Sequence, residues 1–203
     1  MQTKILVTGS NGFLGHYLCQ FLAEQNYLVL AQTRKAQTFS HPNIININFD
    51  LNDSLDNIDL SKVKVIIHCA GRAHVMNETA ASPLEAYRQT NVLGTLNLAQ
   101  KAVESGVKRF IYLSSIKVNG EQTTEQPFKP SDVVNTNDPY GLSKYEAEQV
   151  LLELSKQTGL EVVIIRPVLI YGPNVKANFK SMIGLAKKKL PLPIGCLNNK
   201  RSM

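Results

Sequence analysis

The residues of this sequence best suited to chemistry are a tyrosine and a lysine four positions apart, Tyr140 and Lys144. On a helix, residues at this spacing lie on one face, so the lysine ammonium can lie beneath the phenol. A nearby positive charge favours the phenolate and lowers the phenol pKa from about 10 toward the working pH, where proton transfer is efficient. The pair therefore predicts an acid/base group. The spacing also arises by chance about one time in fifteen, so core packing or a solvated helix face is the alternative.

The segment around this pair has the signals of a helix. Asp138 suits the N-cap, and Pro139 suits the first turn, where its missing N–H has no intrahelical partner to lose. Apolar residues then recur at helical spacing and predict a buried stripe. They are Tyr145, Ala147, Val150, Leu151 and Leu154. Such a stripe would hold the Tyr140 helix against the core.

A strand, a glycine-rich turn and a helix follow one another at the start of the chain. An apolar run at 5–7 predicts a buried strand, and an amphipathic helix is expected to run to about Gln25. Between them, Gly9, Gly12 and Gly15 have the spacing that allows a tight turn, a close approach to a pyrophosphate and helix-on-strand packing. The helix N-terminus offers free N–H groups to the phosphates. The stretch predicts dinucleotide binding, with a purely structural turn as the alternative.

The next two strands predict the adenosine half of the cofactor site. A strand at 27–33 ends where NAD-binding folds usually place an acid for the ribose 2′-hydroxyl, and Gln32 stands there, with Arg34 close behind. A missing acid and an available guanidinium favour the 2′-phosphate of NADP, with a plain surface arginine as the alternative. A strand at 44–47 leads to Asp50 and Leu51, which are placed to meet the adenine. Asp50 is equally suited to cap a short helix.

A strand at 63–67 delivers His68, Ala70 and Gly71 to the carboxyl edge of the sheet, where ligands bind in open α/β folds. The two small residues leave space for a cofactor. His68 has no partner at metal-ligand spacing, so we interpret it as a structural histidine and predict no metal site. A long helix at 82–104 follows and carries Asn91 among apolar neighbours, where a buried amide requires hydrogen-bond partners.

The rest of the chain continues the alternation of strands and helices. A strand at 109–113 ends at Ser114 and Ser115, and the polar, proline-containing stretch 120–139 predicts a loop beside the site. A strand at 160–166 and a helix at 175–188 follow. This alternation predicts an α/β fold with a doubly wound parallel sheet, the Rossmann fold.

Composition narrows the class of protein. The chain has 203 residues, 43% of them hydrophobic, which is enough for one compact domain with a sizeable core. Its net charge of +6 is spread along the chain without a nucleic-acid motif, so we expect a small anionic ligand or a solvated cationic surface and no nucleic-acid partner. The three cysteines lack metal or CxxC spacing and are expected to be reduced thiols. No signal peptide or membrane span is apparent, which predicts a cytoplasmic protein with no membrane partner.

Taken together, these motifs resemble the extended short-chain dehydrogenase/reductase family over all 203 residues. Within it the chain is most similar to NAD(P)-dependent nucleotide-sugar epimerases, dehydratases and 4-ketoreductases, especially those that make sugars for bacterial surface polysaccharides. The segments 114–120, 138–144 and 166–173 are similar to members proposed to reduce UDP-4-keto-6-deoxy-N-acetylhexosamines. The resemblance does not decide between an epimerase and a 4-ketoreductase, because both use the same residues.

The resemblance implies a role for each motif residue. Tyr140 would exchange a proton with the sugar oxygen, Ser115 would orient that oxygen, and Lys144 would lower the phenol pKa and hold the nicotinamide ribose. The implied cofactor contacts, with NADP favoured over NAD by Arg34, are Gly9, Asn11, Gly12, Phe13, Leu14, Gly15, Arg34, Asp50, Leu51, Ala70, Gly71, Asn91, Tyr140, Lys144 and Pro167. The implied contacts to a UDP-linked sugar are His74, Lys117, Asn119, Asn178, Phe179 and Arg201. The two long helices would pair two copies into a homodimer.

Two departures from the family pattern matter. The 4,6-dehydratases follow their catalytic hydroxyl residue with Asp-Glu, whereas this chain has Ile116 and Lys117, which disfavours dehydration. The family also continues with a substrate lobe of about a hundred further residues. We therefore expect an NAD(P)-binding Rossmann domain at 1–173 and only the start of a nucleotide-sugar lobe at 174–203, largely missing. A chain that binds NAD(P) as a fragment or sensor, without catalysis of its own, is the alternative.

Overall fold

A computed structural model describes residues 2–34, 39–73, 82–123, 126–172 and 177–188 of the chain. At its centre is a six-stranded sheet in the order β3-β2-β1-β4-β5-β6, with every neighbouring pair parallel. The strands are β1 (Lys4–Thr8), β2 (Leu28–Thr33), β3 (Ile44–Asn48), β4 (Val63–His68), β5 (Arg109–Leu113) and β6 (Glu161–Ile165). The predicted doubly wound parallel sheet is confirmed, and each predicted strand is present within two residues of its expected bounds.

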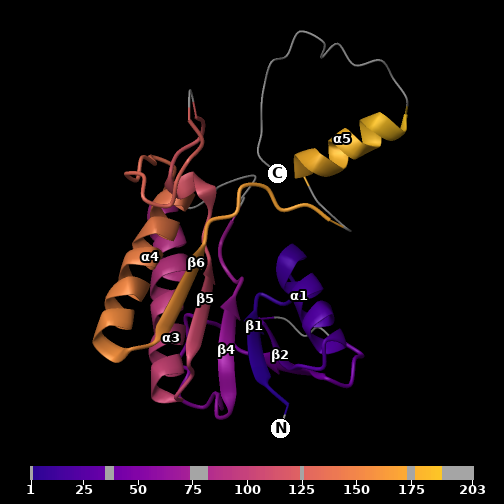
Figure 1. The fold of residues 1–203 in the computed structure, drawn as a ribbon, viewed down its shortest axis with the longest axis vertical. Helices are drawn as coiled ribbons and strands as arrows, with labels where there is room; N and C mark the ends of the chain where they lie inside the picture. Colours follow the sequence, from indigo (N-terminus) through magenta and orange to yellow (C-terminus); the bar gives the residue numbers. More distant parts are fainter. Residues whose placement is uncertain (1, 35–38, 74–81, 124–125, 173–176, 189–203) are drawn as a thin grey trace. The chain divides into compact units, whose positions relative to one another are not determined.

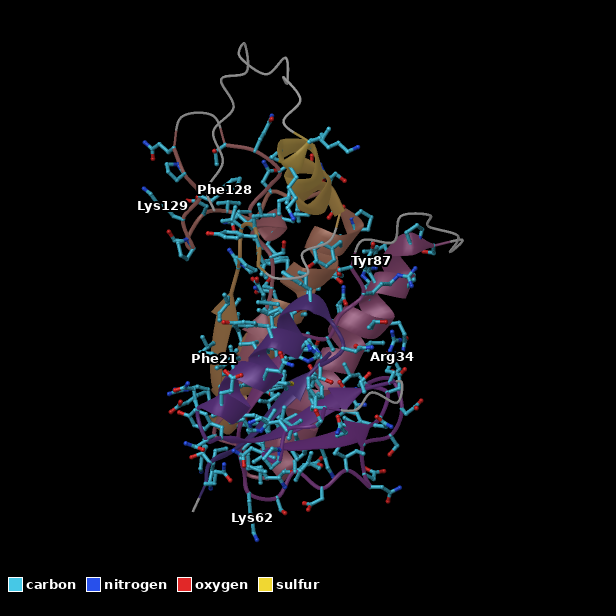
Figure 2. The ribbon with its side chains drawn as sticks, turned by 90° about the vertical axis from the view of Figure 1, so that its right-hand side faces the viewer. Phe21, Arg34, Lys62, Tyr87, Phe128 and Lys129 are labelled. Atoms are coloured by element: carbon cyan, nitrogen blue, oxygen red, sulfur yellow. The ribbon has the colours of Figure 1, made fainter. Side chains whose placement is uncertain are left out.

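The strand order places a crevice at the carboxyl end of β1. The chain winds outward from β1 through β2 to β3, then returns to the other side of β1 with β4. The connections that follow β1 and β3 therefore lead to opposite sides of β1. Open α/β sheets bind ligands at the carboxyl end of the strands where the order reverses in this way. In Figure 2, Lys62 just before β4 and Phe128 in the loop after β5 lie toward opposite ends of the part of the chain that contains the sheet, so the strands run toward the 120–139 loop.

Helices cover the sheet on two sides and enclose separate apolar clusters (Figure 1). The helix α1 (Phe13–Glu24) packs on β1 and β2 through Cys19 and Ala23. The helices α3 (Gly94–Glu104) and α4 (Pro139–Thr158) pack on the other side, where Leu98 and Leu151 are fully buried. Because parallel strands bury both faces, these clusters fix the sheet edge that carries the candidate site.

The long helix predicted at 82–104 is interrupted by a π-helical turn. It consists of α2 (Pro83–Arg88), the π-helical turn η1 (Gln89–Leu93) and α3, which follow one another without a break. The predicted buried amide, Asn91, lies inside η1. Such π-turns in α-helices are frequent at functional sites, and sequence periodicity alone does not reveal them.

The chain divides into two compact units, Met1–Pro167 and Val168–Met203. The first contains the whole sheet, together with the short 3₁₀ turn η2 (Ile116–Val118). In the second, the structure describes 168–172 and the helix α5 (Ala177–Lys187). The functional boundary expected at residue 173 remains a prediction. Among the described helices, none combines the length and apolarity that crossing a bilayer requires.

Candidate active site

The glycine turn after β1 is built so closely that side chains would not fit. Gly9 has a φ of +66°, and a Cβ there would lie 2.8 Å from the backbone N and Cα of Ala70 at the end of β4. The Gly12 N–H donates to the Gly9 carbonyl at 2.8 Å and closes the turn. A Cβ on Gly15, in the first turn of α1, would run into the same carbonyl. The loop therefore lies against both strand ends and the helix.

Gln32 supports this loop from below. Its carboxamide is buried; the oxygen accepts from the Gly9 N–H at 3.0 Å, and the nitrogen donates to the Phe49 carbonyl at 2.6 Å. We expected Gln32 at the position that meets the ribose, but its polar atoms face inward and join β1 to the end of β3. Glutamine serves here because one side chain supplies both an acceptor and a donor.

The ends of β1 to β4 surround one cavity of about 330 Å³. Eight of the predicted cofactor residues line it, together with several of their sequence neighbours. The lining residues are Gly9, Asn11, Gly12, Gln32, Thr33, Arg34, Asp50, Leu51, Cys69, Ala70, Gly71, Arg72, Ala73 and Thr90. Phe13, Leu14 and Gly15 lie at the start of α1, directly after this turn. The α1 N-cap, Gly12, has no side chain to cap the helix.

A dinucleotide fits this arrangement. The uncapped start of α1 carries backbone N–H groups and the positive end of the helix dipole, and its first turn contains no acidic residue. On the β4 side of the cavity, Gly71 packs closely against Asn91 and Lys144. A Cβ at this position would lie 3.1 Å from Asn91 Oδ1 and 3.3 Å from Lys144 Nζ. Phosphate groups can therefore approach the loop backbone, and Lys144 lies directly behind Gly71 of the cavity lining.

Arg34 and Asp50 lie together at one side of the cavity. Their side chains form a long ion pair, with Arg34 Nη1 and Asp50 Oδ2 3.8 Å apart, and the arginine side chain is 69% exposed. Asp50 Oδ1 also accepts from the Asn52 backbone N–H at 3.0 Å, so the carboxylate organises the turn after β3. A solvent-exposed pair at this separation is weak, so the guanidinium can exchange its partner.

Ser115, Tyr140 and Lys144 are brought together at the carboxyl ends of β5 and β4. As predicted, Asp138 caps α4 by accepting from the Gly141 N–H at 2.9 Å, and Pro139 begins the helix. The Ser115 hydroxyl lies close enough to the Tyr140 phenol to lower its pKa. Lys144 is buried; its Nζ donates to the Leu113 carbonyl at 2.9 Å and lies 6.0 Å from the centre of the Tyr140 ring. The loop 120–139 and η2 connect Ser115 to Tyr140 along the chain.

The predicted effect of Lys144 on the phenol is not observed. Burial raises the pKa of Tyr140, with Asp138 and Tyr87 adding to the rise, and the hydrogen bond to Ser115 lowers it only in part. Burial also lowers the pKa of Lys144 to about 8, against the opposing effects of Cys69 and Glu148. The expected lowering was wrong because the Lys144 ammonium is directed to the Leu113 carbonyl and both groups are desolvated.

Asn91 makes different contacts from those expected. Its Oδ1 accepts from the Arg72 N–H at 2.8 Å, and its Nδ2 donates to the Arg72 carbonyl at 3.1 Å and to Ser143 Oγ at 2.9 Å. Ser143 Oγ in turn donates to the Tyr140 carbonyl at 2.8 Å. Both amide hydrogens are thus used within the protein, so Asn91 joins the strand end after β4 to the helix of Tyr140 and leaves no donor for a cofactor.

His68 is the structural histidine that the sequence predicted. It is fully buried, with Nδ1 2.7 Å from Thr8 Oγ1 and Nε2 2.9 Å from Thr95 Oγ1. Thr95 Oγ1 donates to the Asn91 carbonyl, and Thr8 Oγ1 accepts from the Ala70 N–H. Because Thr95 Oγ1 donates its proton to the Asn91 carbonyl, it accepts from Nε2–H of His68, and Nδ1 accepts from the Thr8 hydroxyl. The imidazole is therefore neutral, with its proton on Nε2. A continuous hydrogen-bonded chain therefore links the glycine loop, β4 and the π-helical turn.

The neutral state of His68 predicts an acid-sensitive fold. Burial, and secondarily the charge of Lys144, lowers the pKa of His68 to about 3. Below pH 6.5 the unfolded chain binds a proton that the folded chain excludes, so stability should fall with falling pH by up to about 1.4 kcal/mol per unit. His68→Gln, which retains one donor and one acceptor, should lose this dependence. Urea unfolding at pH 7, 6 and 5 measures it; parallel curves for the two proteins would contradict the prediction.

Comparison with known proteins places this geometry in a family. Residues 5–202 match the model of the NAD dependent epimerase/dehydratase family. The chain belongs to this family. A UDP-glucose 4-epimerase of Vibrio cholerae is 48% identical over 207 residues, covering 100% of this chain and 63% of the relative.

Two solved structures are similar to this epimerase/dehydratase chain. MoeE5, in complex with UDP-glucuronic acid and NAD, has a TM-score of 0.74 at 28% identity and covers 86% of this chain and 57% of its own. The dTDP-glucose 4,6-dehydratase DesIV of Streptomyces venezuelae, with NAD bound, has a TM-score of 0.77 at 28% identity, covering 91% of this chain and 62% of its own. The chain thus spans less than two thirds of the length of each relative.

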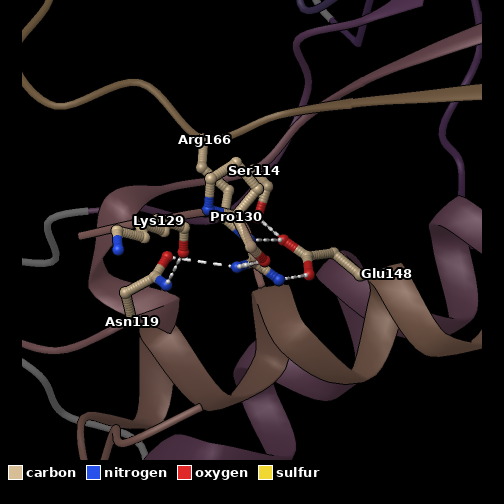
Figure 3. Close-up of polar contacts among 6 residues, drawn as sticks. All are labelled: Ser114, Asn119, Lys129, Pro130, Glu148 and Arg166. Carbon is tan, nitrogen blue, oxygen red and sulfur yellow. Dashed lines mark hydrogen bonds and ion pairs between the residues drawn. The ribbon is translucent and has the colours of Figure 1, made fainter. Parts of the chain in front are cut away.

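On the sugar side of the epimerase/dehydratase site, one expectation is corrected. Asn119 was expected to face the hexose, but it is buried, with Oδ1 accepting from Arg166 Nη1 at 3.1 Å and Nδ2 donating to the Lys129 carbonyl at 3.1 Å (Figure 3). Lys117 is partly exposed, and its Nζ lies 3.3 Å from Asp138 Oδ2 at the start of α4. The charge of Lys117 therefore lies beside the N-cap of α4.

The remaining predicted site residues are Pro167 and four residues whose side chains the structure does not describe. The Pro167 carbonyl accepts from the Ile116 N–H at 3.1 Å, which holds η2 against the end of β6. Asn178 and Phe179 belong to α5, whose first side chains lie outside the described residues, as do His74 and Arg201. Sequence reasoning did not include Cys69, Arg72 and Thr90 in the cavity lining. Their signal was adjacency to Ala70, Gly71 and Asn91, because a strand end brings consecutive backbone atoms to one edge.

Proposed function

We propose that this chain is the dinucleotide-binding and catalytic part of an NAD(P)-dependent nucleotide-sugar epimerase or 4-ketoreductase. The substrate would be a UDP-hexose or UDP-N-acetylhexosamine reacting at C4. The observation that carries the proposal is that Ser115, Tyr140 and Lys144 lie together, with Lys144 next to Gly71 in the lining of a cavity suited to a dinucleotide. The epimerase of Vibrio cholerae and the UDP-glucuronic acid complex of MoeE5 support the substrate class.

Different residues along the cavity would bind different parts of the dinucleotide. The backbone of Gly9, Gly12 and the first turn of α1 would hold the diphosphate, and the Asp50–Leu51 turn would face the adenosine end. Lys144 would contact the nicotinamide ribose at the other end, next to Gly71. When bound, the nicotinamide ring accepts and returns a hydride and, in its oxidised form, adds a positive charge near the phenol.

The chain's own residues would handle the proton. Ser115 would donate a hydrogen bond to the oxygen on C4 and fix its position, while the Tyr140 phenolate would accept the proton of that hydroxyl and the resulting phenol would return it. Since burial raises the pKa of Tyr140, the phenol alone is a poor base at neutral pH. A positive charge close to the ring, from Lys144 and the ligand together, would lower that pKa.

Dehydration is a less suitable reaction for this site. Elimination across the neighbouring sugar carbons requires groups that remove and return protons there, and in the 4,6-dehydratases an Asp-Glu pair follows the hydroxyl residue. This chain has Ile116 and Lys117 at those positions, an apolar side chain and a cation. The site therefore favours chemistry at C4 alone, in the synthesis of sugars for surface polysaccharides.

A homodimer through the two long helices is also part of the proposal. Leu93 in η1 and Leu152 in α4 are large apolar side chains that remain exposed on the helices of the α3 and α4 side of the sheet. Burying them against a second copy would be favourable by about 25 cal/mol per Å² of apolar surface. Sedimentation velocity of the 203-residue chain tests this association.

The function is tested by following the cofactor and the sugar together. The purified protein is denatured, the released dinucleotide is identified by mass spectrometry, and the protein is assayed with UDP-glucose, UDP-N-acetylglucosamine and a UDP-4-keto sugar. Retained NAD with interconversion of C4 epimers indicates an epimerase, whereas exchange of the dinucleotide with reduction of the keto sugar indicates a 4-ketoreductase. Dinucleotide binding without any conversion would favour the binding or sensing module instead.

The cofactor preference is predicted from Arg34. We expect NADPH to bind more tightly than NADH, because the exposed guanidinium can leave its 3.8 Å contact with Asp50 for a 2′-phosphate. Arg34→Ala should close the gap, and so should high salt, since the contact is screened. Lys62→Ala, at the opposite end of the sheet, is the control for net charge. Equal affinities for the two cofactors in a low-salt calorimetric titration would contradict this prediction.

A further inference from the structure

A buried carboxylate that the proposed reaction does not use lies directly behind the candidate site. Glu148 follows Lys144 by one helical turn of α4 and is 1% exposed. Arg166 binds it with two parallel hydrogen bonds, Nε to Oε1 at 2.9 Å and Nη2 to Oε2 at 2.5 Å. Ser114 Oγ donates to Oε1 at 2.5 Å (Figure 3). The carboxylate thus contacts the residue immediately before Ser115.

The same guanidinium reaches the loop that leads to Tyr140. Arg166 Nη1 donates to Asn119 Oδ1 at 3.1 Å and to the Pro130 carbonyl at 3.4 Å. Figure 3 shows these contacts converging on Arg166 from the η2 end, the loop and α4. One ion pair therefore joins the end of β5, the end of β6, the loop 120–139 and the catalytic helix. A planar fork suits this role, because it forms several hydrogen bonds in fixed directions.

Glu148 and Lys144 are also bonded to adjacent residues, Ser114 and Leu113, at the end of β5. A buried ammonium is unfavourable without a counter-charge, and i and i+4 on one helix are neighbours. Burial lowers the pKa of Lys144, and the negative charge of Glu148 opposes that shift. Arg166 and Ser114 satisfy the oxygens of the Glu148 carboxyl group through three hydrogen bonds. The other titratable groups that face the Lys144 ammonium are Cys69, His68, Tyr112 and Tyr140.

We propose that Glu148 and Arg166 are positioning residues of the active site: their ion pair supplies the counter-charge of Lys144 and fixes the strand end that carries Ser115. This inference rests on the proposed function for its catalytic consequence, but the effect of the Glu148 charge on Lys144 can be tested without turnover. A pair that only stabilises the fold would change the unfolding midpoint and leave the protonation of Lys144 as it is.

The decisive experiment is an NMR titration of Lys144 in the 203-residue chain labelled at its lysines. Lys144→Arg identifies the signal by its loss. In Glu148→Gln, which keeps the shape and removes the charge, the Lys144 midpoint should fall by about one pH unit. In Arg166→Lys, Glu148 keeps its charge, so the midpoint should remain at the wild-type value. Turnover of a UDP-sugar should fall about tenfold to a hundredfold in Glu148→Gln, because Ser114 and α4 lose a charged contact.

A matched ion pair provides the control. Arg109 Nη2 and Glu161 Oε2 lie 2.6 Å apart at the start of β5 and β6, with side chains 52% and 59% exposed. Glu161→Gln removes the same charge from the same sheet and should not move the Lys144 midpoint. If Glu148→Gln does not fold, Glu148→Gln with Arg166→Gln leaves no unpaired buried charge, and the same downward shift is expected.

The outcomes separate the two proposals. An unchanged Lys144 midpoint in the Glu148 variants, or an equal shift in Glu161→Gln, overturns the inference. A wild-type protein extended to the length of its relatives that converts no UDP-sugar overturns the proposed function, while a shifted Lys144 midpoint would still establish Glu148 as the counter-charge.

Discussion

In a version of the protein extended to the length of its relatives, Tyr140→Phe should lower turnover of a UDP-sugar by about 10²- to 10⁴-fold, the contribution typical of a positioned acid/base group. The change removes only the phenol oxygen that would exchange a proton with the sugar hydroxyl. The ring, its edge-on contact with Tyr87 and the α4 cap at Asp138 all remain. Dinucleotide affinity should therefore stay close to that of the wild type, so the loss should appear in kcat.

The measurement compares kcat and dinucleotide affinity in the same preparations. Tyr27→Phe is the matched control, because it removes a phenol oxygen from the start of the sheet, directly before β2. Unchanged turnover in Tyr140→Phe would refute the assignment of the acid/base group. A parallel loss of dinucleotide binding would instead show that the phenol oxygen holds the cofactor.

Gly9→Ala should abolish most dinucleotide binding, with affinity falling at least about tenfold, which corresponds to 1.4 kcal/mol. The reason is steric. A Cβ at Gly9 would lie 2.8 Å from the Ala70 backbone, so the ends of β1 and β4 would have to move apart, and both line the cavity. The positive φ of +66° adds strain of about 1–2 kcal/mol for any residue with a Cβ.

Gly106→Ala separates these two effects. Gly106 also has a positive φ, +71°, but a Cβ there meets nothing within 4 Å. The variant should therefore lose about 1 kcal/mol of stability and keep its dinucleotide affinity. Equilibrium titration with NADH and NADPH, combined with urea unfolding, measures both quantities. Equal binding losses in the two variants would show that backbone strain, and not crowding against Ala70, is responsible.

The features that the sequence determined by itself depend on local physics. The glycine turn, the Asp138 cap with Pro139, and the strand periodicities are set by steric limits and hydrogen bonds between near neighbours. The strand–helix alternation then leaves few topologies, because parallel crossovers have one hand. For the same reason the cavity at the ends of β1 to β4 was predictable from the ends of the predicted strands.

The tertiary structure decided which polar side chains face the ligand and which hold the site together. Gln32, Asn91 and Asn119 stand at sequence positions that suggest ligand contacts, yet each is buried and bonded to distant backbone or side-chain groups. Glu148 and Arg166 gave no sequence signal, because an ion pair 18 positions apart forms only once α4 and β6 pack together. The phenol pKa likewise depends on desolvation, which is a property of the packed fold and not of the spacing between Tyr140 and Lys144.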